Sequence, residues 1–426
     1  MKRKPDQTQA IEDKKPLELK KYLPRLIAVI VLFAVSLGFV YYGITHLTSA
    51  TEGVKEVDGE LDPELNRYQN GIHMQYYVDG NSPKVVANNQ KVVTAAFSQG
   101  LKDGFRVLDA RTTYDGWVNL ATLNQNLGKE VNVPTELYAI LKQADEMTRR
   151  GTAYNLFAGP FYAEWEALRY QYNPSEFDPL NDPSELTRLD RLLTACSDLS
   201  NFSLEFLDDE ACTVRFTVEQ SVLNLLADLE MADAPILDLN VLADAFKLQY
   251  VADRLELKGF HNGYLYSDSG MTVALSGFDQ NYDFTLTGLK EDVAVYAAAV
   301  PIQPNASAVN LRAFACEGEE GFYSVQAGGQ TVYRHPWLPA DGVYRNQLLS
   351  AFVWSESQSV PETCFAALSL FQCQTPAEIA ARAAQNSGCQ TALLLPGAPS
   401  TVYTNSDALL VNSEAGFQPA DLASIS

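Results

Sequence analysis

Two neighbouring residues near the C-terminal end of the chain carry side chains that could do chemistry. Glu362 offers a carboxylate that could bind a cation, and Cys364 offers a thiol that could act as a nucleophile. A cation site needs several oxygen ligands, and a thiol nucleophile needs a base beside it. The sequence places no partner carboxylate next to Glu362 and no histidine next to Cys364. We therefore expect Glu362 to be a solvated or capping group and Cys364 to be a buried, apolar cysteine.

The other cysteines do not form a recognisable metal or redox motif. The chain has six cysteines, and none of them forms a C-x-x-C pair. Disulfides between Cys196 and Cys212 or between Cys373 and Cys389 are possible outside the cell, and buried free thiols are the alternative.

Asp238 stands directly before one of the strongest helical patterns in the chain. Apolar residues recur at helical spacing over Leu239–Lys258, and Gly259 can end this helix. An aspartate in this position accepts backbone N–H bonds, so we expect Asp238 to cap the helix. A second clear helix is predicted over Thr135–Arg149, where the apolar residues fall on one face and Gly151 follows the end.

The remaining elements predict a mixed architecture. A helix is expected over Lys91–Leu101, and the capping box Thr375–Glu378 opens another that runs to about Asn386. Strand-like runs occur at Tyr264–Tyr266, Met271–Leu275, Val293–Val300, Ser350–Trp354 and Thr391–Leu395. Helices and strands interleave without a strict βαβ rhythm, which indicates an α+β fold with some β-α units.

A membrane anchor is predicted near the N-terminus. The run Leu26–Ile44 contains no charged residue, and its length nearly matches a hydrocarbon core of roughly 30 Å. Eight basic residues precede it, which favours an N-terminus in the cytoplasm. A cleaved signal peptide is the alternative, but the run is long for one and begins late in the chain. We expect a single-pass protein of the cell membrane whose main domain lies outside the cytoplasm.

The charge balance bears on the partners of that domain. The whole chain has 31 basic and 53 acidic residues, and 23 basic against 49 acidic residues follow the apolar run, which gives this part a net charge of −26. Such a surface repels phosphate backbones, so nucleic-acid binding is not expected.

Four separated segments of the chain form an ordered set of motifs. They are Arg150–Asn155 with Gly159–Phe161 and Trp165, Asp238–Leu239, His335–Gly342 and Pro361–Ala366. In order and spacing these segments resemble the motifs of the FAD:protein FMN transferases, also called ApbE-type flavin transferases. Leu120, Leu123 and Asn124 also keep the register of a motif that precedes the first segment in that family. The resemblance spans roughly residues 73–410, with an unmatched insertion at about 170–235.

The resemblance implies a flavin-transferase-like α+β domain that moves FMN from FAD to a Thr or Ser of a partner protein with the help of magnesium. By family position, His335 would lie at the reaction centre and Glu362 would be the carboxylate at the metal. The residues that would contact the cofactor are Asp238, Ala243, Ser269, Gly270 and Gly342.

Several positions depart from the family pattern. Glu362 replaces an Asp at the metal, and Ala366 replaces a Thr ligand. Asn240 and Val241 replace a pair of glycines, and Asp244 replaces a lysine, so a cation becomes an anion beside the expected diphosphate. Like charges close together at low effective dielectric repel strongly. Packing residues survive better than chemical ones, which is typical of a retained scaffold with a degenerate site.

Three functions remain open on this sequence. The first is a catalytically degenerate binding or scaffold protein with a cell-surface partner, in which His335 would cap the turn Pro339–Gly342. The second is an active, magnesium-dependent FAD:protein FMN transferase, and the third is a binder of flavin or another nucleotide without transfer. FAD and magnesium would be cofactors if the family activity is retained.

The expected domain organisation follows the chain. It comprises a basic cytoplasmic tail (1–25), a transmembrane helix (26–47), a polar stalk (48–72), the flavin-transferase-like domain (73–412) and a short tail (413–426).

Overall fold

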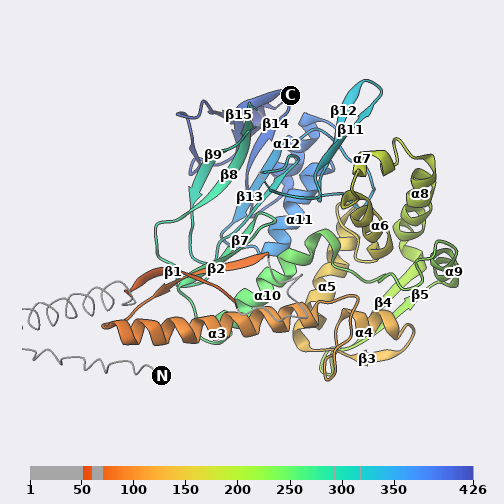
Figure 1. Ribbon diagram of the computed structural model, residues 1–426, viewed down its shortest axis with the longest axis horizontal. Coiled ribbons are helices and arrows are strands. Elements are labelled where there is room, and N and C mark those ends of the chain that lie inside the picture. Colours follow the sequence, from red (N-terminus) through yellow and green to blue (C-terminus); the bar gives the residue numbers. More distant parts are fainter. Residues whose placement is uncertain (1–50, 60–70, 292, 317, 426) are drawn as a thin grey trace, which may run out of the picture. The chain divides into compact units, whose positions relative to one another are not determined.

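The computed structural model describes residues 51–59, 71–291, 293–316 and 318–425 (Figure 1). The predicted membrane run Leu26–Ile44 lies outside these residues, and within them no helix is long and apolar enough to cross a membrane. Of the described residues, 51–52 and 79–88 belong to a small unit. All the remaining described residues form the main unit, which contains every element discussed below except the first residues of one helix.

One large sheet organises the main unit (Figure 1). In the described part of the chain nine strands form it, and all neighbours are antiparallel except the last pair. In spatial order the strands are β1 (Gly53–Val57), β2 (Ile72–Val78), β6 (Gly263–Ser267), β7 (Met271–Ala274), β10 (Ser307–Arg312), β13 (Ser350–Ser355), β14 (Gln390–Leu395), β15 (Ala398–Thr404) and β17 (Gln418–Asp421).

The two faces of this sheet are buried in two separate apolar clusters, because side chains alternate along each strand. Along β13, Phe352 and Trp354 point to one cluster, while Ala351 and Val353 point to the other. A second sheet covers the first face; its strands are β8 (Asp283–Lys290), β9 (Val293–Pro301) and β16 (Leu410–Val411). Helices α10 (Ala243–Leu257) and α11 (Val360–Phe371) cover the opposite face (Figure 1).

The predicted helices and strands are largely confirmed. Helix α5 (Thr135–Arg150) buries Leu137 and Leu141, as its apolar face predicted. Helix α12 (Pro376–Gln385) is capped by the Thr375 side chain, which accepts a hydrogen bond from the Glu378 N–H. Three further helices precede the insertion in the chain, namely α3 (Pro83–Val107), whose first residues belong to the small unit, α4 (Leu120–Gln125) and α6 (Gly159–Arg169).

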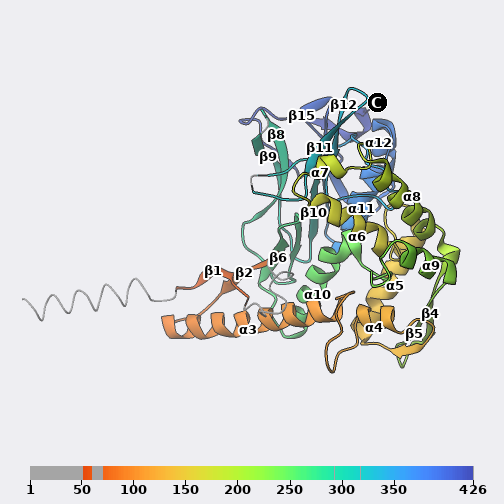
Figure 2. The same cartoon turned by 45° about the vertical axis from the view of Figure 1, so that its right-hand side comes forward.

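The segment expected to be an insertion has its own helices and strands (Figure 2). They are α7 (Pro174–Phe177), α8 (Pro183–Ser197), η1 (Leu199–Asn201), β4 (Phe202–Asp208), β5 (Thr213–Val218) and α9 (Gln220–Asp228). β5 lies between β4 and β3 (Glu130–Asn132) in a small sheet. Near the start of the insertion, fully buried Asp178 accepts two hydrogen bonds from Arg334 at 2.7 and 2.9 Å. Arg334 ends the hairpin of β11 (Tyr323–Ala327) and β12 (Gln330–Arg334), so this ion pair holds the insertion to that hairpin.

Some boundaries differ from those read in the sequence. The segment expected as a stalk contains β1, which pairs with β2 along five residues, and the expected C-terminal tail contains β17 and the short turn η3 (Leu422–Ser424). Short strands in polar segments carry little periodic signal, because only alternate residues need be apolar. The helix expected over Leu239–Lys258 begins instead as a tight turn, η2 (Asn240–Leu242), before α10.

Candidate functional site

A cavity of about 750 Å³ opens between α6, the start of α10 and the β6–β7 turn, a size typical of small-molecule sites. Three residues expected from the sequence to contact a cofactor lie on its wall, namely Asp238, Ala243 and Ser269. His335, Gly342 and Glu362 do not line it, although Pro336 and Trp337, which follow His335, do.

The segment that carries Asp238 is held in place by Asn124. The side-chain amide of Asn124 donates to the carbonyl oxygen of Leu237 at 2.9 Å, and its oxygen accepts from the Ile236 and Leu237 N–H groups at 3.2 and 2.9 Å. Asp238 in turn accepts from the Asn240 N–H at 2.8 Å. Burial raises the pKa of Asp238, while the Asn240 N–H bond and the charges of Arg111 and Lys247 lower it. Asp238 therefore holds the backbone turn at the cavity wall, a capping role close to the one expected.

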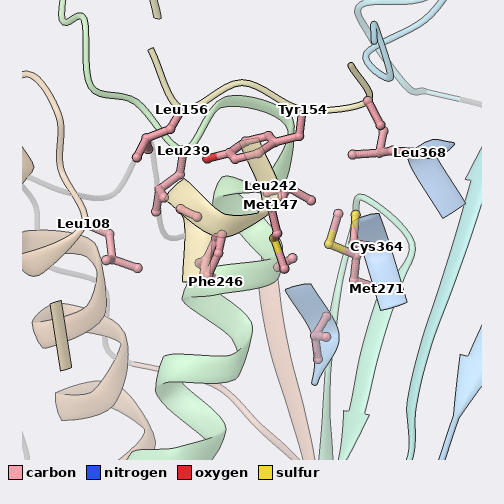
Figure 3. Close-up of a cluster of buried hydrophobic side chains, with 14 of the residues drawn as sticks. Leu108, Met147, Tyr154, Leu156, Leu239, Leu242, Phe246, Met271, Cys364 and Leu368 are labelled. Atoms are coloured by element: carbon pink, nitrogen blue, oxygen red, sulfur yellow. The ribbon is translucent and has the colours of Figure 1, made fainter. Parts of the chain in front are cut away.

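Asn240 keeps the backbone in a conformation that normally calls for glycine. Its φ is 50°, in the left-handed region that asparagine tolerates better than most residues. The Asn240 side chain donates to the carbonyl oxygen of Asn155 at 3.0 Å, which ties the turn to the segment before α6. Leu239, Leu242 and Phe246 then anchor the turn in an apolar cluster with Tyr154 (Figure 3). The first of the two positions at which the resemblance implies glycine therefore has a left-handed backbone in this protein.

The charge reversal at Asp244 is compensated within one helical turn. Lys247 lies 3.7 Å from Asp244 as an i,i+3 pair, and its ammonium group stands 4.7 Å from the centre of the Phe105 ring. Both residues of the pair line the cavity. Sequence reasoning missed Lys247, although a lysine one turn after Asp244 on the same helix face was a readable signal.

The β6–β7 turn supplies Ser269 and Gly270. Gly270 has a φ of 84°, and a Cβ added there would lie 2.4 Å from the carbonyl oxygen of Asn310. Only glycine fits this close approach to β10. The Ser269 hydroxyl is hydrogen-bonded to Ser267 at 2.7 Å, and Gly270 faces a smaller neighbouring cavity instead of the main one.

His335 is enclosed by aromatic rings and is not open to a reactant. It is 1% exposed, with the Tyr344 and Phe371 rings edge-on at 5.0 and 5.3 Å. Its Nδ1 atom has no hydrogen-bond partner. Burial, with added repulsion from Arg169 and Arg334, lowers the pKa of His335 to about 3. The imidazole is therefore neutral at pH 7.

Gly342 belongs to the turn after His335 and not to the cavity. Its N–H donates to the carbonyl oxygen of Pro339 at 2.9 Å, and its φ is 70°. An added Cβ would lie 2.9 Å from Leu193 of α8, so this glycine allows the insertion to pack closely.

Glu362 forms an ion pair with a basic side chain of the protein. Its carboxylate accepts a hydrogen bond from Arg150 at 2.7 Å, and the Arg150 guanidinium lies over the Phe365 ring at 4.7 Å. Ala366, at the second ligand position implied by the resemblance, is 6% exposed and has no ligating group. Among the described residues, no group of three or more His, Cys, Asp or Glu side chains could hold a metal ion. The residues at these positions do not fit the magnesium site that the resemblance implies.

The cysteines are free thiols in the structure, which agrees with the second alternative considered above. Cys364 is fully buried in the same apolar cluster as Met271 (Figure 3). Burial raises the pKa of its thiol, and the charge of Asp244 adds to this shift. The expectation of a buried, apolar cysteine is confirmed.

The fold matches solved flavin transferases. The flavin transferase ApbE from Vibrio cholerae matches with a TM-score of 0.53 and 12% identity, over 84% of this chain and 98% of that one. The ApbE protein from Thermotoga maritima matches with a TM-score of 0.51 and 14% identity, over 83% of this chain and 97% of that one. No protein-family model matches the sequence, and no curated protein matches it. The chain therefore has the α+β fold of the ApbE flavin transferases, as its ordered motifs led us to expect.

Proposed function

We propose that this protein is a membrane-anchored, extracytoplasmic relative of the flavin transferases that does not transfer FMN and acts as a binding or scaffold protein for a cell-surface partner. The observation that carries the proposal is the Arg150–Glu362 ion pair, with N and O atoms 2.7 Å apart. A cation needs free carboxylate oxygens, and Arg150 competes for the one carboxylate at the expected metal position. Ala366 supplies no second ligand there.

The test is a transfer assay with the full-length protein in detergent. The protein is incubated with FAD, magnesium and a flavin-acceptor protein, and covalent flavin is read as fluorescence on a denaturing gel. An active ApbE transferase run in parallel is the positive control. We expect an unlabelled acceptor. Labelling that disappears when a chelator is added would instead establish the active, magnesium-dependent transferase.

The cavity favours a second candidate, the binding of flavin or another nucleotide without transfer. Its volume of about 750 Å³ suits a ligand of this size, and its wall mixes aromatic, charged and backbone groups. Titration of flavin fluorescence with and without magnesium separates the candidates. Quenching that does not depend on magnesium supports the binder, and no quenching leaves the scaffold, whose partner would be sought by pull-down.

The membrane location rests on the apolar run Leu26–Ile44 and its basic flank. A cysteine placed at Ser49 should react with a membrane-impermeant reagent in intact cells. The partly exposed Cys316 and Cys389 are first replaced by serine to remove background labelling. Reaction only after lysis would contradict this topology.

A further inference from the structure

The insertion at residues 170–235 is much more acidic than the rest of the chain. It contains 14 acidic residues against three basic ones, which gives it a net charge of −11. The whole part of the chain after the apolar run has a net charge of −26, so this short segment supplies 11 of those negative charges. Carboxylates at this density attract a basic partner and repel an acidic one.

The first part of the insertion also exposes large apolar side chains. Fifteen large hydrophobic residues are exposed among the described residues, and five of them fall within positions 170–186. These five form what we call the apolar surface: Tyr170, Tyr172, Phe177, Leu180 and Leu186. Tyr172 is 98% exposed, so its ring packs against almost nothing in this chain. Single exposed apolar residues are ordinary, but a group of them on one short segment is typical of a protein interaction site.

Hydrogen bonds hold this exposed segment in a fixed shape. The backbone carbonyl oxygen of Asp178 accepts from the Asn181 and Asp182 N–H groups at 2.7 and 2.8 Å. The Asn181 side chain donates to the carbonyl oxygen of Ser175 at 2.7 Å, and Tyr323 of β11 donates to the Asp178 carboxylate at 2.9 Å. Helix α7 is thereby held beside β11 (Figure 2). A surface that is ordered before binding loses little conformational entropy when a partner docks.

The carboxylates beside the apolar surface are not neutralised within the chain. No basic residue occurs at positions 170–187, and the next one, Arg188, pairs with Glu164 at 2.9 Å. Glu176, Asp182 and Glu185 form no ion pair with any residue that the structure describes. This segment therefore presents apolar side chains among carboxylates that lack a counter-charge.

We propose that the apolar surface docks a partner protein through a basic segment that also carries apolar side chains. This inference rests on the proposed role as a binding or scaffold protein, and it names the surface and the kind of partner. A second copy of this chain would bring the same negative charge against the insertion, and anionic membrane head groups would be repelled in the same way. A basic protein segment matches both the carboxylates and the aromatic side chains, which are enriched at protein interfaces.

A photo-crosslinker placed on the apolar surface tests the proposal with the full-length protein in its native cells. The amino acid p-benzoylphenylalanine replaces Tyr172 in one variant, and it replaces Tyr296, an exposed tyrosine of β9 outside the insertion, in the control. After irradiation, the attached peptides are identified by mass spectrometry. We expect position 172, and not position 296, to crosslink to a protein segment with an excess of Lys and Arg.

Four results of this experiment would overturn the proposal. They are the absence of a crosslink from position 172, crosslinks only to a second copy of this chain or to lipid, crosslinks to a neutral or acidic segment, and the same products from both positions.

Two substitutions made beside the crosslinker at position 172 test the charge and the apolar contact separately. Glu176→Lys reverses a charge of the surface, and Glu414→Lys is the control at an exposed glutamate outside the insertion. Leu180→Ser removes an apolar contact, and Leu410→Ser is its control at an exposed leucine of β16.

Both surface substitutions should lower the crosslinking yield about fivefold at equal protein level, a change of the size expected for one interface contact, and the controls should not. An unchanged yield in both surface variants, or an equal loss in the controls, would refute the docking surface.

The outcomes also separate this inference from the proposed function. Covalent labelling of an acceptor protein with flavin would overturn the non-transferring role and would leave the crosslinking result intact. Failure of the crosslinking experiment without any flavin transfer would count against the docking surface alone.

Discussion

The Nη2 atom of Arg150 donates a hydrogen bond to the Oε2 atom of Glu362 at 2.7 Å, across 212 residues of sequence. The pair joins the end of α5 to the first turn of α11, and the Glu362 side chain is only 25% exposed. In this protein a guanidinium stands against the carboxylate that the motif resemblance assigns to a metal ion. This ion pair makes it possible to test whether Glu362 binds a metal ion.

Glu362→Gln should lower the free energy of unfolding by about 1 kcal/mol, because the partly exposed pair is screened by water. The double variant with Arg150→Met should be less destabilised than the sum of the two single variants, since the partners interact directly. Thermal unfolding of the wild type should not respond to magnesium or to EDTA. A rise in melting temperature with magnesium that Glu362→Gln abolishes would show that Glu362 holds the metal after all.

Asp178→Asn should be far more damaging, at about 3 kcal/mol or more, because it leaves Arg334 buried beside a neutral group. Asp178 is fully buried and the Arg334 side chain is 7% exposed. Urea unfolding measures the loss, and limited proteolysis should cut near residues 170–186 as the insertion loses its anchor. The exposed pair of Glu205 and Arg215 is the matched control, and Glu205→Gln should cost less than 1 kcal/mol, a value of roughly the size found for surface pairs. Equal losses at the two sites would contradict the anchoring role.

Local signals in the sequence were enough to place most elements. Helix α5 follows from its own apolar face, and α12 follows from the Thr375 cap and Pro376, because helix periodicity and capping depend on residues a few positions apart. The ordered motifs also placed Asp238 and Ser269, which both line the cavity.

Long-range pairs could not be read in the same way. The Arg150–Glu362 and Asp178–Arg334 contacts join residues 212 and 156 positions apart, so no local pattern encodes them.

Asn240→Gly should be more stable than Asn240→Ala by about 1 kcal/mol. At a φ of 50° the backbone of alanine is sterically strained, whereas glycine adopts this left-handed conformation without strain. Both changes remove the same hydrogen bond to Asn155, so their difference isolates the backbone. Asn224, exposed in the middle of α9, is the control with the opposite sign, since helices favour alanine over glycine. The same order of stability at both positions would show that the turn at Asn240 does not require this conformation.

The last prediction concerns the acid sensitivity of the fold, which should depend on His335. Its pKa lies near 3 in the folded protein, against 6.5 as the ordinary value for the unfolded chain. Between these values the unfolded state binds more protons at His335, so this residue lowers the free energy of unfolding as the pH falls from 6.5 towards 3. The slope reaches about 1.4 kcal/mol per pH unit at most, the value for one proton. Above pH 6.5 the imidazole is neutral in both the folded and the unfolded state, so this loss of stability is absent.

Two non-titrating replacements, His335→Gln and His335→Leu, should both remove this slope. The measurement is urea unfolding at several pH values between 4 and 7.5, in which the difference in free energy between each variant and the wild type is plotted against pH. Near neutral pH both variants should have a lower free energy of unfolding than the wild type. This difference should become smaller as the pH falls, because only the wild type has an imidazole that is protonated in the unfolded state and not in the fold. Parallel curves would mean that His335 has the same pKa in the folded and unfolded states, and a solvent-accessible imidazole would then return as a candidate general base.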